Sequence, residues 1–213
     1  MDDYIQSKNP IFIESCVESL HEAMRVSTLG IQSIELCSHL EVGGLTPSIS
    51  LVREVVHAVD VDVKVMIRNR GGDFMYSPND LSEMLHQINI LKQENIKGIV
   101  FGALDINNTI HLENLKTIIK AASPLPITFH KAIDCTPNII ESVQILSKFP
   151  QIKYILSSGG AETADLGSTM LKAMAKVKSN HQNIIAAGRI TSENLAYIRE
   201  KTGLSHFHGR QIV

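Results

Sequence analysis

The chain has 213 residues, of which 44% are apolar and 20% are charged, and its formal net charge at pH 7 is −2. Basic side chains (20) nearly balance acidic ones (22), so no polybasic surface is available to hold nucleic acid or a membrane. No apolar run approaches the roughly 20 residues that a membrane-spanning helix needs. We therefore expect a soluble protein with no nucleic-acid or membrane partner.

The N-terminal sequence and the cysteine count indicate the cellular compartment. The first ten residues, MDDYIQSKNP, are acidic and polar. They lack the basic segment followed by an apolar one that marks a secretory signal. Three cysteines cannot form a disulfide framework, and an odd number fits reduced thiols. The sequence predicts a cytoplasmic protein.

Short β-rich runs alternate with amphipathic segments along the whole chain. Apolar residues recur at helical spacing over 81–91, 112–119 and 166–174, which predicts helices there. Successive strands start about 20 to 35 residues apart, which is the length of a βα unit. The eight predicted strands begin near Ile11, Ile31, Val63, Ile96, Leu125, Ile152, Asn183 and Leu204.

Eight strands alternating with helices fit either a doubly wound open sheet or a closed barrel. No GxGxxG motif follows the first strand, which removes the main support for a dinucleotide-binding sheet. The number of strands favours a TIM-type (β/α)8 barrel. Because no linker or low-complexity tract divides the chain, we expect residues 1–213 to form one domain.

The end of the chain departs from a complete barrel of this type. Only four residues, 210–213, follow the last predicted strand, so the eighth helix has no sequence from which to form. The groove between the first and last helices would then expose an apolar seam, which is costly in water. We expect the N-terminal segment or a second copy of the chain to cover it, and the second case predicts a homo-oligomer.

Polar side chains gather at the carboxyl ends of the predicted strands, where barrels of this type carry their chemistry. Glu14 and Cys16 end the first strand, and Glu35 and Cys37 end the second. Residues two apart on a strand share a face. If both pairs point inward, two thiols and two carboxylates lie side by side in the barrel. A buried carboxylate needs a partner, and Arg68 is the predicted counter-charge.

Two interpretations of this polar set remain open. The residues either satisfy one another and only fill the barrel, or they line a cleft for a small anionic or phosphorylated metabolite. In the second case the predicted acid–base groups are Glu14, Glu35, Arg68, His130 and His208. Backbone N–H groups of the loops after the sixth to eighth strands would face the anion. The predicted ligand-binding residues are Arg70, Asp73, Ser158, Gly159, Gly188, Arg189 and Gly209.

Four stretches of the sequence resemble those of the CutC family, whose name refers to copper homeostasis. They are ELCSHLEVGGLTPS (35–48), VMIRNRGGDFMYS (65–77), TFHKAID (128–134) and FHG (207–209). The resemblance extends over nearly the whole chain. It implies a somewhat open eight-stranded TIM-type barrel that is cytoplasmic and usually oligomeric. The chain departs from the family pattern at Asn69 (commonly Pro), Lys131 (Arg) and Ile133 (Phe).

The resemblance also implies a role in copper handling, with Cu(I) as the ligand. Soft thiolate sulfurs select Cu(I), and Cys16 and Cys37 are the candidate ligands because they end neighbouring strands. A buried cysteine also serves as a small apolar side chain, so the two thiols have a purely structural alternative. The sequence leaves both the copper function and the metabolite function as hypotheses.

Overall fold

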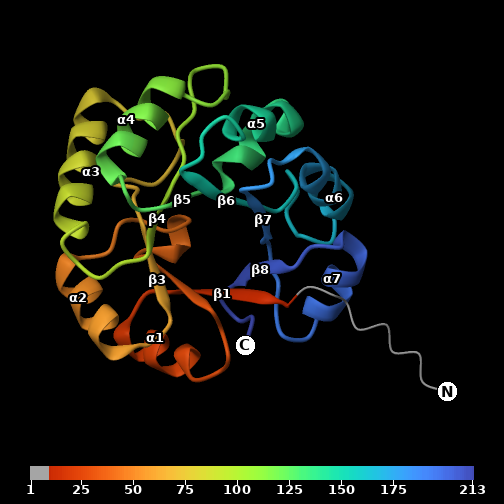
Figure 1. The fold of residues 1–213 in the computed structure, drawn as a ribbon, viewed down its shortest axis with the longest axis horizontal. Helices are drawn as coiled ribbons and strands as arrows, with labels where there is room; N and C mark the ends of the chain where they lie inside the picture. Colours follow the sequence, from red (N-terminus) through yellow and green to blue (C-terminus); the bar gives the residue numbers. More distant parts are fainter. Residues whose placement is uncertain (1–9) are drawn as a thin grey trace.

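The computed structural model describes residues 10–213, so the predicted N-terminal cover over 1–9 lies outside the described residues. Strands and helices alternate along the chain, and the helices surround the strands (Figure 1). The strands are β1 (Phe12–Val17), β2 (Ser33–Leu36), β3 (Asp62–Met66), β4 (Gly98–Phe101), β5 (Ile127–Phe129), β6 (Ile152–Ser157), β7 (Asn183–Ala186) and β8 (His206–Gly209). The helices are α1 (Leu20–Ser27), α2 (Ile49–Ala58), α3 (Pro78–Leu91), α4 (Leu112–Ala122), α5 (Ile139–Leu146), α6 (Ser168–Val177) and α7 (Leu195–Thr202). Two short 3-10 helices, η1 (Leu40–Val42) and η2 (Lys131–Cys135), follow β2 and β5.

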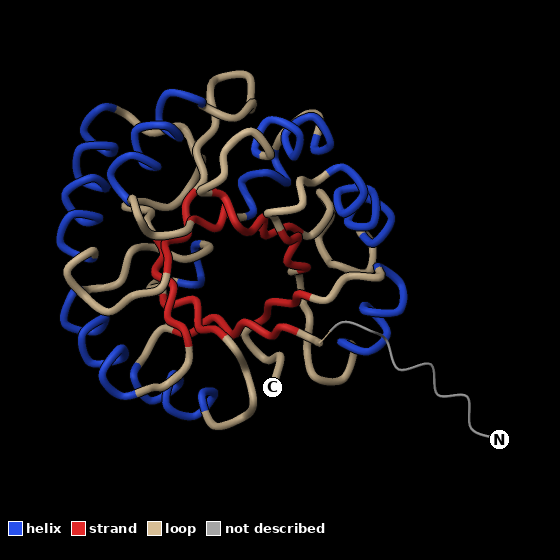
Figure 2. Tube along the Cα trace, viewed as in Figure 1, coloured by secondary structure: helices blue, strands red, loops and turns tan. Residues whose placement is uncertain are grey.

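The eight strands are parallel and form a closed ring in chain order (Figure 2). β1 pairs with β2 on one side and with β8 on the other, with Glu14 opposite Ser33 and His208. The predicted TIM-type barrel is therefore confirmed. The expected opening does not lie in the strands, because the ladder closes fully. It lies in the helical layer, where no helix follows β8.

The strand starts differ from the predicted positions by two residues at most. The observed α3 and α4 cover the segments predicted over 81–91 and 112–119. α6 begins two residues later than the predicted 166–174, so Leu166 lies outside the helix and is exposed. Ser77 begins α3 through a reciprocal capping box, in which its hydroxyl accepts from the Asp80 N–H and the Asp80 carboxylate accepts from the Ser77 N–H. Such a cap satisfies two backbone donors that a helix leaves free.

Strand alternation divides the side chains into two sets. Outward residues such as Ile34, Val65 and Phe101 are fully buried under the helices and belong to one large apolar core. Inward residues include a charged and polar set, together with two small apolar clusters inside the barrel. The polar chemistry of this protein is therefore concentrated inside the ring of strands.

Residues 210–213, which follow β8, pack between the segments on either side of it. Ile212 is buried in the core, and Gln211 bridges to Thr191 in the segment between β7 and α7. Arg210 pairs with Glu18 and Glu22 at the start of α1. The four residues 210–213 thus act as a strap between the two helices that flank the seam, a cover that the sequence prediction did not consider.

Within residues 10–213, the longest helix is too short and too polar to cross a bilayer.

Candidate functional site

A cavity of about 130 Å³ lies inside the barrel at the carboxyl ends of the strands. This is the end at which TIM-type barrels carry their chemistry. Four of the predicted acid–base groups and one predicted copper ligand line it together. The lining side chains are Cys16, Glu35, Leu40, Gly43, Met66, Arg68, Phe74, His130, Lys131, Leu156 and His208.

Beneath the cavity, Glu14 is held in a buried ion-pair network. Its Oε2 lies 2.6 Å from Lys64 Nζ and accepts a 3.0 Å hydrogen bond from Ser33 Oγ, and its Oε1 lies 3.1 Å from His208 Nδ1. Lys64 is therefore the counter-charge inside the barrel, and the prediction that Arg68 has this role is wrong. The signal for Lys64 was present in the sequence, because Lys64 and Met66 on β3 and Arg68 just beyond its end are two residues apart and so share the inward face.

The two glutamates of the barrel interior have opposite electrostatics. Burial favours the protonated form of Glu14, but Lys64 and the hydrogen bond to His208 outweigh it and hold the Glu14 pKa well below its ordinary value. Burial and the nearby Glu14 charge raise the pKa of Glu35 to about 7. Its Oε2 is buried and has no hydrogen-bond partner. Glu35 therefore faces the cavity as a group that exchanges a proton near neutral pH.

His208 connects the Glu14 network to the cavity. Burial opposes its charged form, but the Cys16 side chain, Glu35 and Glu14 together raise the His208 pKa well above its ordinary value. A 3.1 Å hydrogen bond with Glu14 holds the ring. A cationic imidazole thus lies between a carboxylate and a thiol.

Arg68 is buried at the cavity wall, where it ties loops together. Its Nη1 donates to the carbonyls of Val42 and Gly44, and its Nη2 donates to the carbonyl of Gly72 at 2.7 Å. Its Nε is buried without a partner. Within residues 10–213, Arg68 forms no ion pair with a carboxylate.

His130 is a neutral hydrogen-bond donor. Burial and the Arg68 charge lower the His130 pKa to about 3. Its Nδ1 accepts from the Ala132 N–H at 3.2 Å, so its proton is on Nε2, and Nε2 is buried without a partner. The Phe74 ring contacts both groups, 4.9 Å from the His130 ring and 4.8 Å from the Arg68 guanidinium carbon.

The two predicted copper ligands lie on the same inward face but in different surroundings. Cys16 on β1 is opposite Glu35 on β2, and Cys37 follows Glu35 by two residues, just past the end of β2. Cys16 lines the cavity, whereas Cys37 packs with Met66 and Val100 in a small apolar cluster. Burial and the Glu35 charge raise the pKa of the Cys37 thiol far above its ordinary value.

The predicted ligand-binding residues of the loop after β3 lie outside the cavity lining. Arg70 forms two ion pairs with nearby carboxylates. Its Nη2 lies 2.9 Å from Asp73 Oδ1, and its Nε lies 3.3 Å from Asp80 Oδ2. Asp73 also accepts from the Met75 N–H. These contacts hold the loop that carries Phe74 into the site. A direct role of Arg70 or Asp73 in binding a ligand stays a prediction.

The loop after β6 forms an anion-binding nest, but a side chain of the same chain fills it. The Asp134 carboxylate accepts from the Ser158 and Gly160 N–H groups and from the Ser157 and Ser158 hydroxyls, at 2.5 to 3.0 Å. Gly159, next to these donors, packs against the backbone of Gly167. The donors that we assigned to a phosphate thus already bind an anion, and the signal was the acidic Asp134 at the end of the TFHKAID stretch.

The last predicted ligand-binding residues also do not line the cavity. A side chain on Gly188 would meet Ser158 and the Ala164 backbone, and one on Gly209 would overlap the Ile190 carbonyl. Both glycines are therefore positions of close packing. Arg189 is exposed and pairs with Glu162. Binding of a ligand by Gly188, Arg189 or Gly209 stays a prediction.

Three side chains inside the barrel could ligate a metal ion. Oxygen and nitrogen atoms of Glu14, Glu35 and His208 lie within 4.8 Å of one another. Lys64 and the cationic His208 already neutralise this cluster, since both contact the Glu14 carboxylate. A hard divalent cation would have to displace one of these positive charges, so the cluster fits an internal ion-pair network better than a metal centre.

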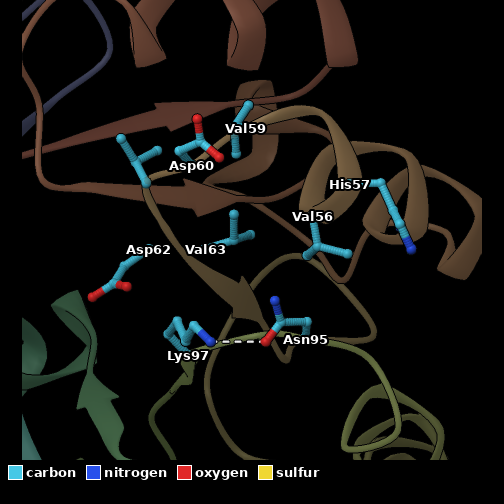
Figure 3. Close-up of a pocket in the computed structure, with 9 residues that line it drawn as sticks. Val56, His57, Val59, Asp60, Asp62, Val63, Asn95 and Lys97 are labelled. Carbon is cyan, nitrogen blue, oxygen red and sulfur yellow. Dashed lines mark hydrogen bonds between the residues drawn. The ribbon is translucent and has the colours of Figure 1, made fainter.

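A second pocket lies at the opposite end of the barrel, where α2 ends and β3 begins (Figure 3). Its volume is about 310 Å³. The polar side chains around it, which include His57, Asp60 and Asp62, are exposed, and Lys97 binds Asn95 Oδ1 at 2.7 Å. The pocket contains no buried titratable group, so the site at the carboxyl ends of the strands remains the stronger candidate.

Comparison with known proteins agrees with the barrel fold. The family model described as the CutC family matches residues 11–213. A CutC family protein from Mesorhizobium japonicum is 33% identical over 92% of this chain and 76% of its own length. The human copper homeostasis protein cutC homolog is 34% identical over 94% of this chain and 73% of its own length.

Solved structures give the same result. The crystal structure of CutC from Streptococcus agalactiae is 32% identical, covers 95% of this chain and all of its own, and superposes with a TM-score of 0.90. Dihydrodipicolinate synthase DapA-2 from Bacillus anthracis shares 14% identity over 94% of this chain and 70% of its own, with a TM-score of 0.63, so the likeness is one of fold alone. The chain belongs to the CutC family.

Proposed function

We propose that this protein acts in copper homeostasis by binding Cu(I) between Cys16 and Cys37. Curated relatives in Homo sapiens and Dictyostelium discoideum are named copper homeostasis protein cutC homologs. Two thiolates give the low-coordinate sulfur site that Cu(I) prefers over harder ligands. The three free thiols of the chain fit a reducing compartment, and we place the protein in the cytoplasm.

The observation that carries the proposal is the gathering of sulfur on the inward face of β1 to β3. Cys16 is opposite Glu35, so Cys37 is its diagonal neighbour across the ladder. Met66 packs against Cys37, and a side chain added at Gly44 would touch both of them. A thioether beside two thiols adds a third soft atom to the same wall of the barrel.

Copper binding at this wall requires a rearrangement of protons. Burial keeps the Cys37 thiol protonated, whereas the ligand is the thiolate. Each Cu(I) must therefore release the Cys37 proton. Cys16 lines the cavity together with the cationic imidazole of His208, whereas Cys37 lies outside the cavity lining. We expect Cys16 to be the first ligand and Cys37 the second.

The test is an anaerobic Cu(I) titration against a competing chelator. The wild-type chain is expected to bind about one equivalent through two thiolates, and the double variant Cys16→Ser, Cys37→Ser should lose that equivalent. Cys135 provides the matched control, because it is also a free thiol but is exposed in η2, outside the cavity lining. Cys135→Ser should bind as the wild type does. Unchanged stoichiometry in the double variant would reject the proposal.

A second candidate function is catalysis on a small anionic metabolite. The specific observation is the cavity, which combines two cationic side chains, Arg68 and Lys131, with two groups suited to proton transfer, Glu35 and His208. The Glu35 pKa of about 7 matches the requirement of a general acid or base at neutral pH. A small acid bound here would lie within reach of both proton-transfer groups.

Self-association belongs to the same set of proposals. The strap over 210–213 covers one end of the seam, and α7 and α1 do not form a closely packed helix pair in the described chain. A second copy of the chain would bury what remains exposed. The homo-oligomer therefore stays our proposal for the assembled state.

A further inference from the structure

We infer that the cavity is a receptor for a small carboxylate, whose two oxygens accept hydrogen bonds from Arg68 Nε and His130 Nε2. This inference names the ligand class for the second candidate function and rests on it. It is independent of copper, because neither donor is a sulfur ligand. The argument has four parts: an unpaired cation, a second free donor, the number of these donors and a third buried group in the cavity lining.

The unpaired cation is Arg68. Its side chain is only 4% exposed, and no carboxylate within residues 10–213 forms an ion pair with it. Its Nη atoms donate to three backbone carbonyls, while Nε has no partner. Burying a guanidinium without an opposite charge costs several kcal/mol. A bound anion at Nε would supply both the missing charge and the missing hydrogen bond.

The second free donor is His130. Because Nδ1 accepts from the Ala132 N–H, the proton on the ring is at Nε2 and points away from that loop. His130 is 4% exposed and Nε2 has no partner. The Phe74 ring lies against both His130 and Arg68, so the two donors are held by one rigid neighbour. Fixed donors at a cavity wall are what a planar oxyanion requires.

The number of buried unpaired donors favours a carboxylate over a phosphate. The cavity of about 130 Å³ holds roughly four water molecules at about 30 Å³ each. Two free donors match the two oxygens of a carboxylate, whereas a phosphate group carries up to two negative charges and three acceptor oxygens. The nest that has enough donors for a phosphate is the one that Asp134 fills.

A third buried group in the cavity lining defines the rest of the ligand. Glu35 lines the same space, and its Oε2 is buried without a partner. A hydroxyl group on the ligand would donate to this oxygen and satisfy it. The chemical class that fits these groups is a small hydroxy acid, with the carboxylate at Arg68 and His130 and the hydroxyl at Glu35.

The test measures binding of glycolate and lactate to the full chain by ligand-observed NMR, in buffer that contains a Cu(I) chelator. Both probes are expected to bind, and acetate, which lacks the hydroxyl, should bind about tenfold more weakly. Inorganic phosphate should not displace them. Displacement by phosphate at equal concentration would overturn the carboxylate assignment and leave the anionic-metabolite function standing. Absence of binding by every probe would overturn the inference.

Two variants each remove one of the hydrogen-bond donors and are expected to leave the fold intact. His130→Asn keeps an acceptor for the Ala132 N–H and removes the Nε2 donor. Arg68→Lys keeps the charge and removes the Nε–H group. Each is expected to weaken lactate binding by about tenfold or more, with an unchanged circular dichroism spectrum.

The matched control is Arg53→Gln, which removes an arginine ion pair with Glu94 on the outside of the barrel. It should bind lactate as the wild type does. Wild-type affinity in His130→Asn and Arg68→Lys would show that the two free donors do not hold the ligand. The Cu(I) titration measures the sulfur site separately, so the copper proposal and the carboxylate proposal can each fail without the other.

Discussion

At the scale of single residues, the barrel interior depends on one buried positive charge. Lys64 Nζ lies 2.6 Å from Glu14 Oε2 and 3.8 Å from the centre of the Tyr154 ring. Phe12 and His206 stack beside the same ammonium group. The ring faces and the carboxylate both favour the charged lysine. The desolvation of the Lys64 and Glu14 charges is therefore offset by contacts on several sides.

We predict that Lys64→Met lowers the free energy of unfolding by about 3–5 kcal/mol at neutral pH, because it leaves Glu14 buried without its main partner. Urea unfolding followed by circular dichroism measures the change. The double variant Lys64→Met, Glu14→Gln should recover part of the loss, since no unpaired charge then remains.

The control for this prediction is a lysine–carboxylate pair at the surface. Lys201 pairs with Asp165, and both side chains are about half exposed, so solvent screens their attraction. Lys201→Met should leave the unfolding curve close to that of the wild type. If both lysine variants lost the same stability, burial would not be the reason for the importance of Lys64.

At the scale of elements, the strap over 210–213 joins the segments on either side of β8. Two kinds of contact hold it: the buried side chain of Ile212 and the ion pairs of Arg210 with Glu18 and Glu22. Arg210 is half exposed, whereas Ile212 is 1% exposed. Exposed ion pairs contribute little, whereas a buried aliphatic side chain contributes several kcal/mol.

We predict that Ile212→Ala lowers the free energy of unfolding by about 2–4 kcal/mol, while Arg210→Ala lowers it by less than about 1 kcal/mol. The stability lost in Ile212→Ala should also appear as faster amide hydrogen exchange in β8 and α1, which the strap joins. A larger effect from Arg210→Ala would mean that the ion pairs, and not the apolar contact, fix the end of the chain.

At the scale of the whole molecule, the fold could be predicted from the sequence because each strand run and helical period is local. Period-two alternation also placed Glu14, Cys16 and Glu35 correctly on the inward face. The same rule could not place Cys37 outside the cavity, because that depends on how Met66 and Val100 pack around it. A local pattern also could not predict contacts between residues distant along the chain, such as those of Asp134 with the nest after β6.

The missing information was therefore pairing across the barrel. Lys64 and Glu14 are separated by 50 positions, and His208 and Glu14 by 194. Spacing along the chain says which residues face inward but not which inward charges meet. Arg68 was the wrong choice of counter-charge because it lies beyond the end of β3, at the level of the loops, where carbonyl oxygens accept hydrogen bonds from its guanidinium.

The stability of the folded chain should depend on pH through the Glu35 carboxyl. Its pKa is about 7 in the folded chain against an ordinary value of 4.5, so between these two values the folded state holds a proton that the unfolded state has lost. The folded state binds more protons in this window, so the Glu35 contribution to stability falls as pH rises from about 4.5 to about 7 and is constant above it. Glu14, whose pKa is lowered, acts with the opposite sign and loses its contribution only as pH falls below its ordinary value.

We predict that Glu35→Gln removes the fall between these two pH values, because an amide has no proton to lose. Relative to the wild type, the variant should gain about 3 kcal/mol in unfolding free energy between about pH 4.5 and about pH 8. Urea unfolding of both proteins at several pH values in this range gives the difference directly. A difference that stays constant across the range would mean that Glu35 is ionised in the folded barrel, and Glu35 would then be unable to act as a proton donor at neutral pH.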